Sequence, residues 1–166
     1  MKNIALISLF CLSLASIPPA LAAADTASPT YAGNFAAKFD PKRDAAKDLA
    51  DAVAKAKAEH KHVIVDVGGE WCVWCLRMDK FMQGNAQIME AVNAHFVWVK
   101  INYSDENNNK DVLAQFPKIK GYPHLFVLDQ NGSVLQSQST GAFEQEKSYN
   151  ADTIIHFLRE WAPQQP

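Results

Sequence analysis

Two cysteines dominate the chemistry that this sequence could carry. Cys72 and Cys75 lie in the segment GGEWCVWCLRM, each directly after a tryptophan and beside an apolar run. A closely spaced thiol pair can bind a metal ion, tie the chain together as a structural disulfide, or cycle between dithiol and disulfide. The surrounding sequence decides among these three interpretations.

A metal site and a structural staple both find little support. A structural zinc site needs four ligands, usually two CxxC pairs or one pair with two nearby histidines. The third cysteine, Cys11, lies in an apolar N-terminal stretch that is expected to be removed, and the histidines are scattered: His60, His62, His95, His124 and His156. A disulfide over so short a loop restricts the unfolded chain little. A redox pair is favoured, and a copper or zinc carrier that uses the same thiols is an alternative.

The cysteines are expected where a strand hands over to a helix. Residues 62–67 (HVIVDV) are typical of a buried strand, Gly68 and Gly69 end it, and a helix is predicted from about Cys72 to Met82. Unpaired N–H groups and the helix dipole favour a thiolate at Cys72, which lowers a thiol pKa from its ordinary value of about 8.5. Cys75, one turn later, is placed to resolve a mixed disulfide formed by Cys72.

The remaining elements indicate an α/β fold with a mixed central sheet. Further strands are expected at residues 96–103, 124–129 and 133–139, and further helices from Asp40-Pro41 onward, from about Asn85, around residues 112–116 and over about 150–162. The tetrapeptide at residues 129–132 (DQNG) is a hairpin signature. Strands separated by helices favour parallel pairing, and the final hairpin implies an antiparallel edge. Helices are predicted to flank this sheet.

With these elements in this order, residues 42–162 resemble the thioredoxin superfamily. VIVDVGGEWCVWC is similar to the family's strand, turn and WCxxC motif, VKIN to its second strand, and GYPHLFVLDQNG to the segment that holds its cis-proline. Within the superfamily, the chain is most similar to the C-terminal domain of DsbD-type electron carriers and to thioredoxin-like 7 proteins. The resemblance implies a thioredoxin fold and a redox-active disulfide between Cys72 and Cys75.

The residues between the cysteines bear on the direction of electron flow. Val73 and Trp74 differ from the Gly-Pro, Pro-His and Gly-His pairs of well-known members. Strongly oxidising members carry a histidine just before the second cysteine, which helps to hold the thiolate, and Trp74 cannot do this. A reductase or interchange protein is therefore favoured over a strong oxidant.

The resemblance also implies roles for charged residues around the cysteines. Asp66 falls on the family's buried acid, which relays protons to the resolving cysteine, and Lys100 falls on its partner lysine. Asp79 stands where the DsbD domain has a second acid, and Glu70 is a further supporting candidate. A buried acid near a thiol shifts the pKa of both groups.

Four residues are expected to bind the substrate. Trp71 is predicted to cover the disulfide, and Trp74 to form an exposed docking surface. Tyr122 and Pro123 belong to the segment that resembles the cis-proline loop, which would lie beside the disulfide.

The N-terminal stretch predicts export. Lys2 precedes an apolar run at residues 4–17, a proline pair and small residues suited to a signal peptidase. Residues 1–24 are therefore expected to be a signal peptide, 25–40 a flexible leader and 41–162 the thioredoxin-like domain. The periplasm is the expected location.

Composition and motif together define the expected function. A net charge of −2 without a basic cluster gives no basis for nucleic-acid binding. We expect an exported thiol-disulfide oxidoreductase of the protein-disulfide reductase type, monomeric and without a cofactor. Its partners would be disulfide-bearing exported proteins and a membrane electron donor. A redox-inactive binding module is the second alternative.

Overall fold

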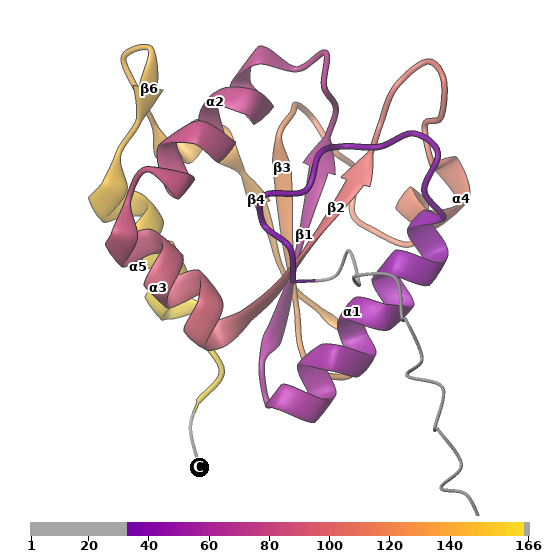
Figure 1. Ribbon diagram of the computed structural model, residues 1–166, viewed down its shortest axis with the longest axis horizontal. Coiled ribbons are helices and arrows are strands. Elements are labelled where there is room, and N and C mark those ends of the chain that lie inside the picture. Colours follow the sequence, from indigo (N-terminus) through magenta and orange to yellow (C-terminus); the bar gives the residue numbers. More distant parts are fainter. Residues whose placement is uncertain (1–32, 165–166) are drawn as a thin grey trace, which may run out of the picture.

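Strand β1 (His62–Gly68) occupies the interior of a four-stranded sheet in the computed structural model, which describes residues 33–164 (Figure 1). The strand order is β2-β1-β3-β4. Strand β2 (Phe96–Asn102) pairs parallel to β1, β3 (His124–Leu128) pairs antiparallel to β1, and β4 (Val134–Ser139) pairs antiparallel to β3. The predicted mixed sheet with a terminal antiparallel hairpin is confirmed.

Parallel pairing is limited to β1 and β2. The segment between β2 and β3 holds one short helix, α4 (Lys110–Leu113, 4 residues), and does not carry the chain back along the sheet. The chain enters β3 from the end at which β2 finished and runs in the opposite direction.

The longer helices lie close to their predicted positions. They are α1 (Ala45–Glu59), α2 (Val73–Gln83), α3 (Ala86–His95) and α5 (Ala151–Glu160). Helix α1 begins later than the predicted Asp40-Pro41, because the Asp44 side chain accepts a hydrogen bond from the Lys47 N–H at 3.0 Å and caps the helix there. A 3-10 helix (Thr140–Phe143) and a small hairpin of β5 (Glu144–Gln145) and β6 (Ser148–Tyr149) were not predicted.

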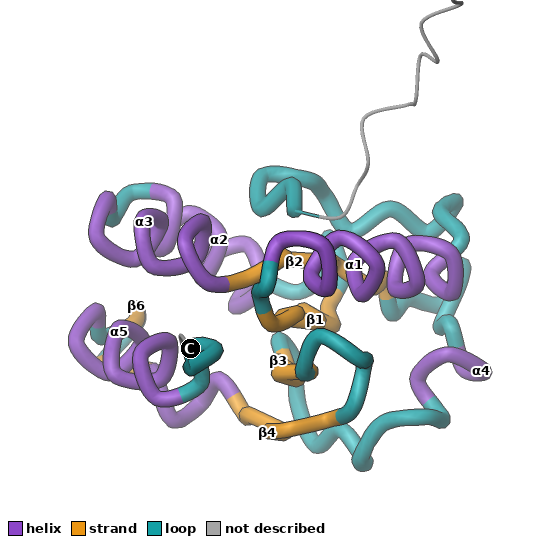
Figure 2. Tube along the Cα trace, turned by 90° about the horizontal axis from the view of Figure 1, so that it is seen from below, coloured by secondary structure: helices purple, strands orange, loops and turns teal. Residues whose placement is uncertain are grey.

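Different helices cover the two faces of the sheet. Side chains at even positions of β1 and β2, such as Ile64 and Trp98, pack in one core with α2, α3 and α5. Those at odd positions, such as Val65 and Val99, pack in a second core with α1. Figure 2 shows α2, α3 and α5 gathered on one side of the strands, away from α1 and α4.

The predicted flexible leader differs from the structure in its second half. Phe35 and Phe39 are 4% and 1% exposed, and the Gly33 N–H donates to the Trp98 carbonyl oxygen at 2.7 Å. Residues 33–40 therefore belong to the packed fold, and a domain boundary at residue 41 is too late. The rest of the predicted leader and the predicted signal peptide lie outside the described residues. Within residues 33–164, no helix has the length and apolar character needed to cross a bilayer.

Candidate active site

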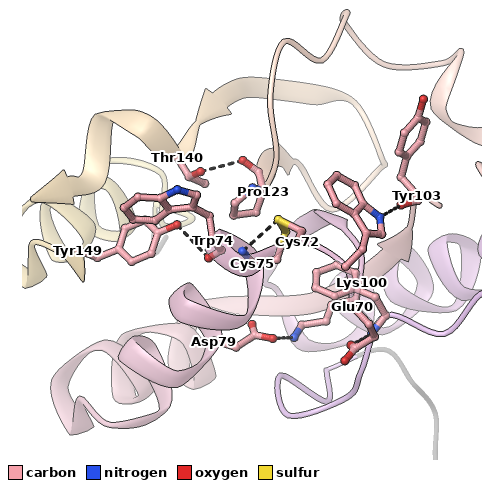
Figure 3. The surroundings of a disulfide bond; sticks show 12 residues. Glu70, Cys72, Trp74, Cys75, Asp79, Lys100, Tyr103, Pro123, Thr140 and Tyr149 are labelled. Carbon is pink, nitrogen blue, oxygen red and sulfur yellow. Dashed lines mark hydrogen bonds and ion pairs between the residues drawn. A yellow bond between two sulfur atoms is a disulfide. The ribbon is translucent and has the colours of Figure 1, made fainter. Parts of the chain in front are cut away.

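Cys72 and Cys75 form a disulfide where the chain enters α2 (Figure 3). Cys72 is the N-cap residue of this helix, and its Sγ accepts a hydrogen bond from the Cys75 N–H at 3.1 Å. This is the predicted strand-to-helix junction. An N–H donor at the Cys72 sulfur stabilises negative charge there once the disulfide is reduced. Both cysteines are buried, Cys75 completely.

Gly68, at the end of β1, allows the Cys75 sulfur to approach the sheet. A Cβ atom at this position would lie 2.5 Å from the Cys75 Sγ and 3.0 Å from Cζ of Phe39. The sequence indicated Gly68 only as the end of a strand, because the crowding arises from residues that fold onto it. Cys75 thus packs on the even face of β1, the face to which Asp66 also belongs.

We expect Gly68→Ala to lower the free energy of unfolding by about 1–3 kcal/mol, the range for overpacking a filled site. The new methyl group must displace the Cys75 sulfur, so closure of the disulfide should also slow. Denaturant unfolding and the rate of reoxidation measure the two effects. Gly121→Ala is the matched control, since a Cβ there meets nothing within 4 Å. Equal stability of the two variants would contradict this account.

Asp66 lies fully buried in β1 and is only partly compensated. Its Oδ2 accepts a hydrogen bond from the Trp98 indole N–H at 3.3 Å, while Oδ1 has no hydrogen-bond partner. Burial raises the pKa of Asp66 to about 7, against the opposing effect of the Lys100 ammonium; Asp79 adds to the rise. A carboxyl with this pKa exchanges protons near neutral pH, as the predicted relay requires.

Lys100 joins Asp66 to a second carboxylate. Lys100 lies opposite Asp66 in the register of β1 and β2, and its buried ammonium forms an ion pair with Asp79 on α2. Burial raises the pKa of Asp79 as well, and Lys100 opposes that rise. Two acids that share one cation in a dry site disfavour double ionisation, so the group tends to retain a proton.

Glu70 is exposed and lies at the edge of this charged group. Its Oε1 accepts a hydrogen bond from the Phe39 N–H at 2.9 Å, and its negative charge adds to the rise in the pKa of Asp79. Of the supporting residues predicted from the sequence, Lys100 is buried, Asp79 is partly buried, and Glu70 is an exposed anchor for the N-terminal segment.

Pro123 stands on the opposite side of the disulfide from the charged group (Figure 3). The Tyr122–Pro123 peptide bond is cis, as the resemblance implied, and the Pro123 carbonyl oxygen accepts a hydrogen bond from the Thr140 hydroxyl at 2.7 Å. Thr140 belongs to the 3-10 helix that was not predicted, so this support for Pro123 was not predicted either. Tyr122 packs against the cysteines.

Exposed apolar side chains surround the entrance to the disulfide. The most exposed are Trp71 at 56% and Val73 at 64%, together with Leu76 and Tyr103. The Trp71 indole N–H donates to the Tyr103 carbonyl oxygen at 2.6 Å, and its ring meets Tyr122 edge-on at 5.7 Å. These contacts hold the Trp71 ring in place beside a groove lined by Trp71, Tyr103, Ser104, Asp105 and Glu106.

Trp74 does not form the exposed surface that was predicted. Its ring is half-buried against Tyr149, with ring centroids 5.5 Å apart, and the Arg77 guanidinium lies 4.2 Å from the ring centroid. The Tyr149 hydroxyl donates to the Trp74 carbonyl oxygen at 3.1 Å. The β5–β6 hairpin, which carries Tyr149, covers this side of α2, and Trp74 packs against the cysteines from within.

His124, the histidine that follows Pro123, contacts a serine on the neighbouring strand. His124, at the start of β3, is buried, and its ring contacts the Ser137 hydroxyl oxygen at 2.9 Å. Burial lowers the pKa of His124. Among residues 33–164, no three His, Cys, Asp or Glu side chains are arranged to hold a metal ion.

A family model described as thioredoxin-like matches residues 44–130, just over half of the 166-residue chain. Two curated relatives are thiol:disulfide interchange proteins DsbD. The one from Pseudoalteromonas atlantica is 26% identical over 94 residues, 57% of this chain, and the one from Colwellia psychrerythraea is 29% identical over 92 residues, 55% of this chain. The chain spans only 16% and 15% of their lengths.

Solved structures share the fold. A disulphide isomerase from Xylella fastidiosa Temecula1 has a TM-score of 0.65 and 24% identity, with 74% of this chain and 94% of the other covered. The C-terminal domain of DsbD from Neisseria meningitidis, in the oxidised form, has a TM-score of 0.54 and 22% identity, with 75% and 99% covered. At these identities the likeness concerns the fold alone.

Proposed function

Because the chain belongs to the thioredoxin-like family, we propose that it is a thiol-disulfide oxidoreductase that cycles Cys72 and Cys75 between disulfide and dithiol. The predicted resemblance to the thioredoxin superfamily is confirmed. One observation carries the proposal: a disulfide at the N-terminus of α2 places Cys72 at the cap, directly on a backbone donor. Cys75 lies behind it on the face of β1 that carries Asp66.

The exchange proceeds in two steps. The Cys72 thiolate attacks one sulfur of a substrate disulfide, forms a mixed disulfide and releases the other substrate sulfur as a thiolate. Cys75 then gives its proton to Asp66 and attacks the Cys72 sulfur, which releases the second substrate thiolate and closes the Cys72–Cys75 disulfide. Two electrons pass from the protein dithiol to the substrate, and the substrate thiolates take up the protons.

The proposed direction is reduction. Residue 74 is tryptophan, and His124 contacts Ser137, so no histidine supports the Cys72 thiolate from within the motif. The group of Asp66, Asp79 and Lys100 contains two acids and one cation, so it adds no positive charge that would stabilise a thiolate. The dithiol should therefore give up its two electrons readily, and the disulfide should be a weak oxidant.

The setting is also part of the proposal. We propose that residues 1–24 direct export to the periplasm, where a membrane electron donor recharges the protein and disulfide-bearing exported proteins are its substrates. An exported reductant must be recharged in an oxidising compartment, and the relatives are named interchange proteins DsbD. A monomer without a cofactor suffices for the exchange.

Insulin reduction with an added electron source tests the proposed activity. Equilibration with glutathione buffers tests its direction, with a potential of roughly −200 to −280 mV expected, near thioredoxin's about −270 mV rather than DsbA's about −120 mV. A potential near DsbA's would indicate an oxidant. Stoichiometric metal after purification, without insulin reduction, would favour the copper or zinc carrier. The absence of metal, of insulin reduction and of any mixed disulfide would favour the redox-inactive binding module.

Trp71→Ala should weaken substrate binding without disabling the dithiol. The exposed indole offers a large apolar contact beside the disulfide, so we expect KM for a protein disulfide to rise about 3–10-fold, as for an interface anchor. Attack on a small disulfide reagent should keep its rate. Leu135→Ala removes a similarly exposed side chain from β4 and is the control. Parallel losses on large and small substrates would disprove the docking role.

A further inference from the structure

Residues 33–39, which we call the N-terminal strap, are fixed across the inner side of the proposed redox centre. The Gly33 N–H donates to the Trp98 carbonyl oxygen at 2.7 Å, and the Phe39 N–H donates to Oε1 of Glu70 at 2.9 Å. The first bond attaches the strap to β2, and the second attaches it to the turn after β1. In Figure 1 this indigo segment crosses the sheet before it reaches α1.

The Phe39 ring shares the space around the Cys75 sulfur. Phe39 is 1% exposed and packs in one cluster with Cys72 and Cys75. Its Cζ and the Cys75 Sγ both lie over Gly68, 3.0 Å and 2.5 Å from where a Cβ would stand. The ring therefore fills volume that water would otherwise occupy next to the resolving sulfur.

The strap also contacts the charged group. The Lys100 ammonium lies 4.8 Å from the Phe39 ring centroid and 5.5 Å from that of Phe35, while it forms its ion pair with Asp79. An aromatic face attracts a cation most strongly where both are desolvated. Phe35 meets Trp98 edge-on at 4.7 Å, and Trp98 is the residue that donates to Asp66.

We infer that Phe39 is a positioning residue of the redox centre. Its backbone is anchored by Glu70, and its ring shields Cys75 from solvent and holds the Lys100 ammonium against Asp79. This role rests on the proposed function, because it concerns the step in which Cys75 resolves the mixed disulfide. Shielding leaves Cys72 as the sulfur that meets outside disulfides. Cys75 then reacts with the mixed disulfide that forms beside it rather than with other thiols or oxidants.

Alkylation of the reduced full-length protein tests this inference. Iodoacetamide at neutral pH, followed by tandem mass spectrometry of the peptide that contains both cysteines, gives a rate for each sulfur. In the wild type, Cys75 should react at least about 10-fold more slowly than Cys72, because a buried thiol is protected. Phe39→Ala should raise the Cys75 rate about 10-fold, and Phe39→Leu, which refills part of the space, should raise it less.

The anchor provides a second, milder variant. Glu70→Ala removes the acceptor for the Phe39 N–H and should also raise the Cys75 rate, whereas Glu70→Gln keeps an amide oxygen at that position and should stay close to the wild type. This comparison decides the matter if Phe39→Ala does not fold. Equal Cys75 rates in Glu70→Ala and Glu70→Gln would then overturn the inference.

A remote core variant separates positioning from general stability. Phe126→Leu changes a fully buried ring in the core on the other face of the sheet and should lower the melting temperature without altering the ratio of the two alkylation rates. If Phe39→Ala lowers the melting temperature in the same way and leaves the ratio unchanged, Phe39 only fills space. Alkylation requires no substrate turnover, so a failure of insulin reduction would overturn the proposed function separately.

Discussion

Cys72→Ser should abolish disulfide exchange, whereas Cys75→Ser should perform one attack and then stop. The structure predicts this asymmetry because Cys72 caps α2 beside the exposed side chains of Trp71 and Val73, while Cys75 is buried behind it. Loss of the attacking nucleophile should lower turnover by more than about 1,000-fold, the scale seen when other enzymes lose theirs. Without Cys75, the mixed disulfide has no internal thiol to resolve it.

The aromatic disulfide reagent DTNB counts the two steps. Reduction of one DTNB releases two coloured thionitrobenzoate ions, the first on attack by Cys72 and the second on closure by Cys75. The wild-type dithiol should release both, Cys75→Ser should release one and keep the other bound, and Cys72→Ser should release almost none at early times. If Cys72→Ser instead releases the first ion at the wild-type rate, Cys75 is the nucleophile and the assignment is reversed.

The parts of the fold that follow from local sequence were predictable. The β-branched run at residues 62–67 and the Asp129 to Gly132 turn set their own geometry: Asp129 accepts hydrogen bonds from the N–H groups of Asn131 and Ser133, and Gly132 adopts φ 87°. The Cys72 cap also follows from local sequence, because its sulfur bonds to an N–H three residues later. Such features depend on few distant contacts.

The features that were predicted wrongly depend on contacts with distant parts of the chain. Residues 33–40 show no periodicity that marks a strand or helix, and they are ordered by contacts with Glu70 and Trp98 far along the sequence. Trp74 was predicted to form an exposed docking surface. The β5–β6 hairpin, whose Tyr149 follows it by 75 positions, covers it. Burial of this kind is a tertiary property that no local pattern encodes.

The residues of the charged group were predicted from the sequence, but the interactions among them were not. Matching Asp66, Lys100 and Asp79 to the thioredoxin and DsbD patterns identified three separate positions. In the structure the Lys100 ammonium forms an ion pair with Asp79 and not with Asp66, although its charge opposes the rise that burial causes in the pKa of both acids. Asp66 is therefore the buried acid without an ion-pair partner, and position 66 is the most informative place to test the mechanism.

Asp66→Asn should slow the release of the second thionitrobenzoate about 100-fold while the first release keeps its rate. Loss of a positioned proton acceptor commonly costs about 100–10,000-fold, and we expect the lower end because water can enter once Cys72 is joined to a substrate. The asparagine has nearly the shape of the protonated acid, so the Trp98 contact and the fold should persist. Stopped-flow absorbance resolves the two releases. Equal slowing of both would assign Asp66 a role in structure instead of proton transfer.

The same substitution should change how stability depends on pH. The pKa of Asp66 is about 7 in the folded protein and near 3.8 in the unfolded chain. Below about pH 4 the residue is protonated in both states and does not lower the free energy of unfolding. As the pH rises from about 4 to 7, the unfolded chain loses the proton first and wild-type stability falls. Each pKa unit is worth about 1.4 kcal/mol, so the loss attributable to this residue is about 4 kcal/mol at pH 8.

Asparagine does not ionise, so the variant should avoid that loss. Relative to the wild type, Asp66→Asn should gain little at pH 4 and up to about 4 kcal/mol at pH 8, measured by urea unfolding of the oxidised proteins across the range. The raised pKa of Asp79 gives both proteins a slope of the same sign, and because the two acids are coupled, the difference reports on position 66 together with any change in the pKa of Asp79. Glu90→Gln, an exposed position on α3, should give a flat difference. A flat difference for Asp66→Asn as well would mean that Asp66 titrates in the folded protein as it does in water, and a neutral-pH proton relay through it would be ruled out.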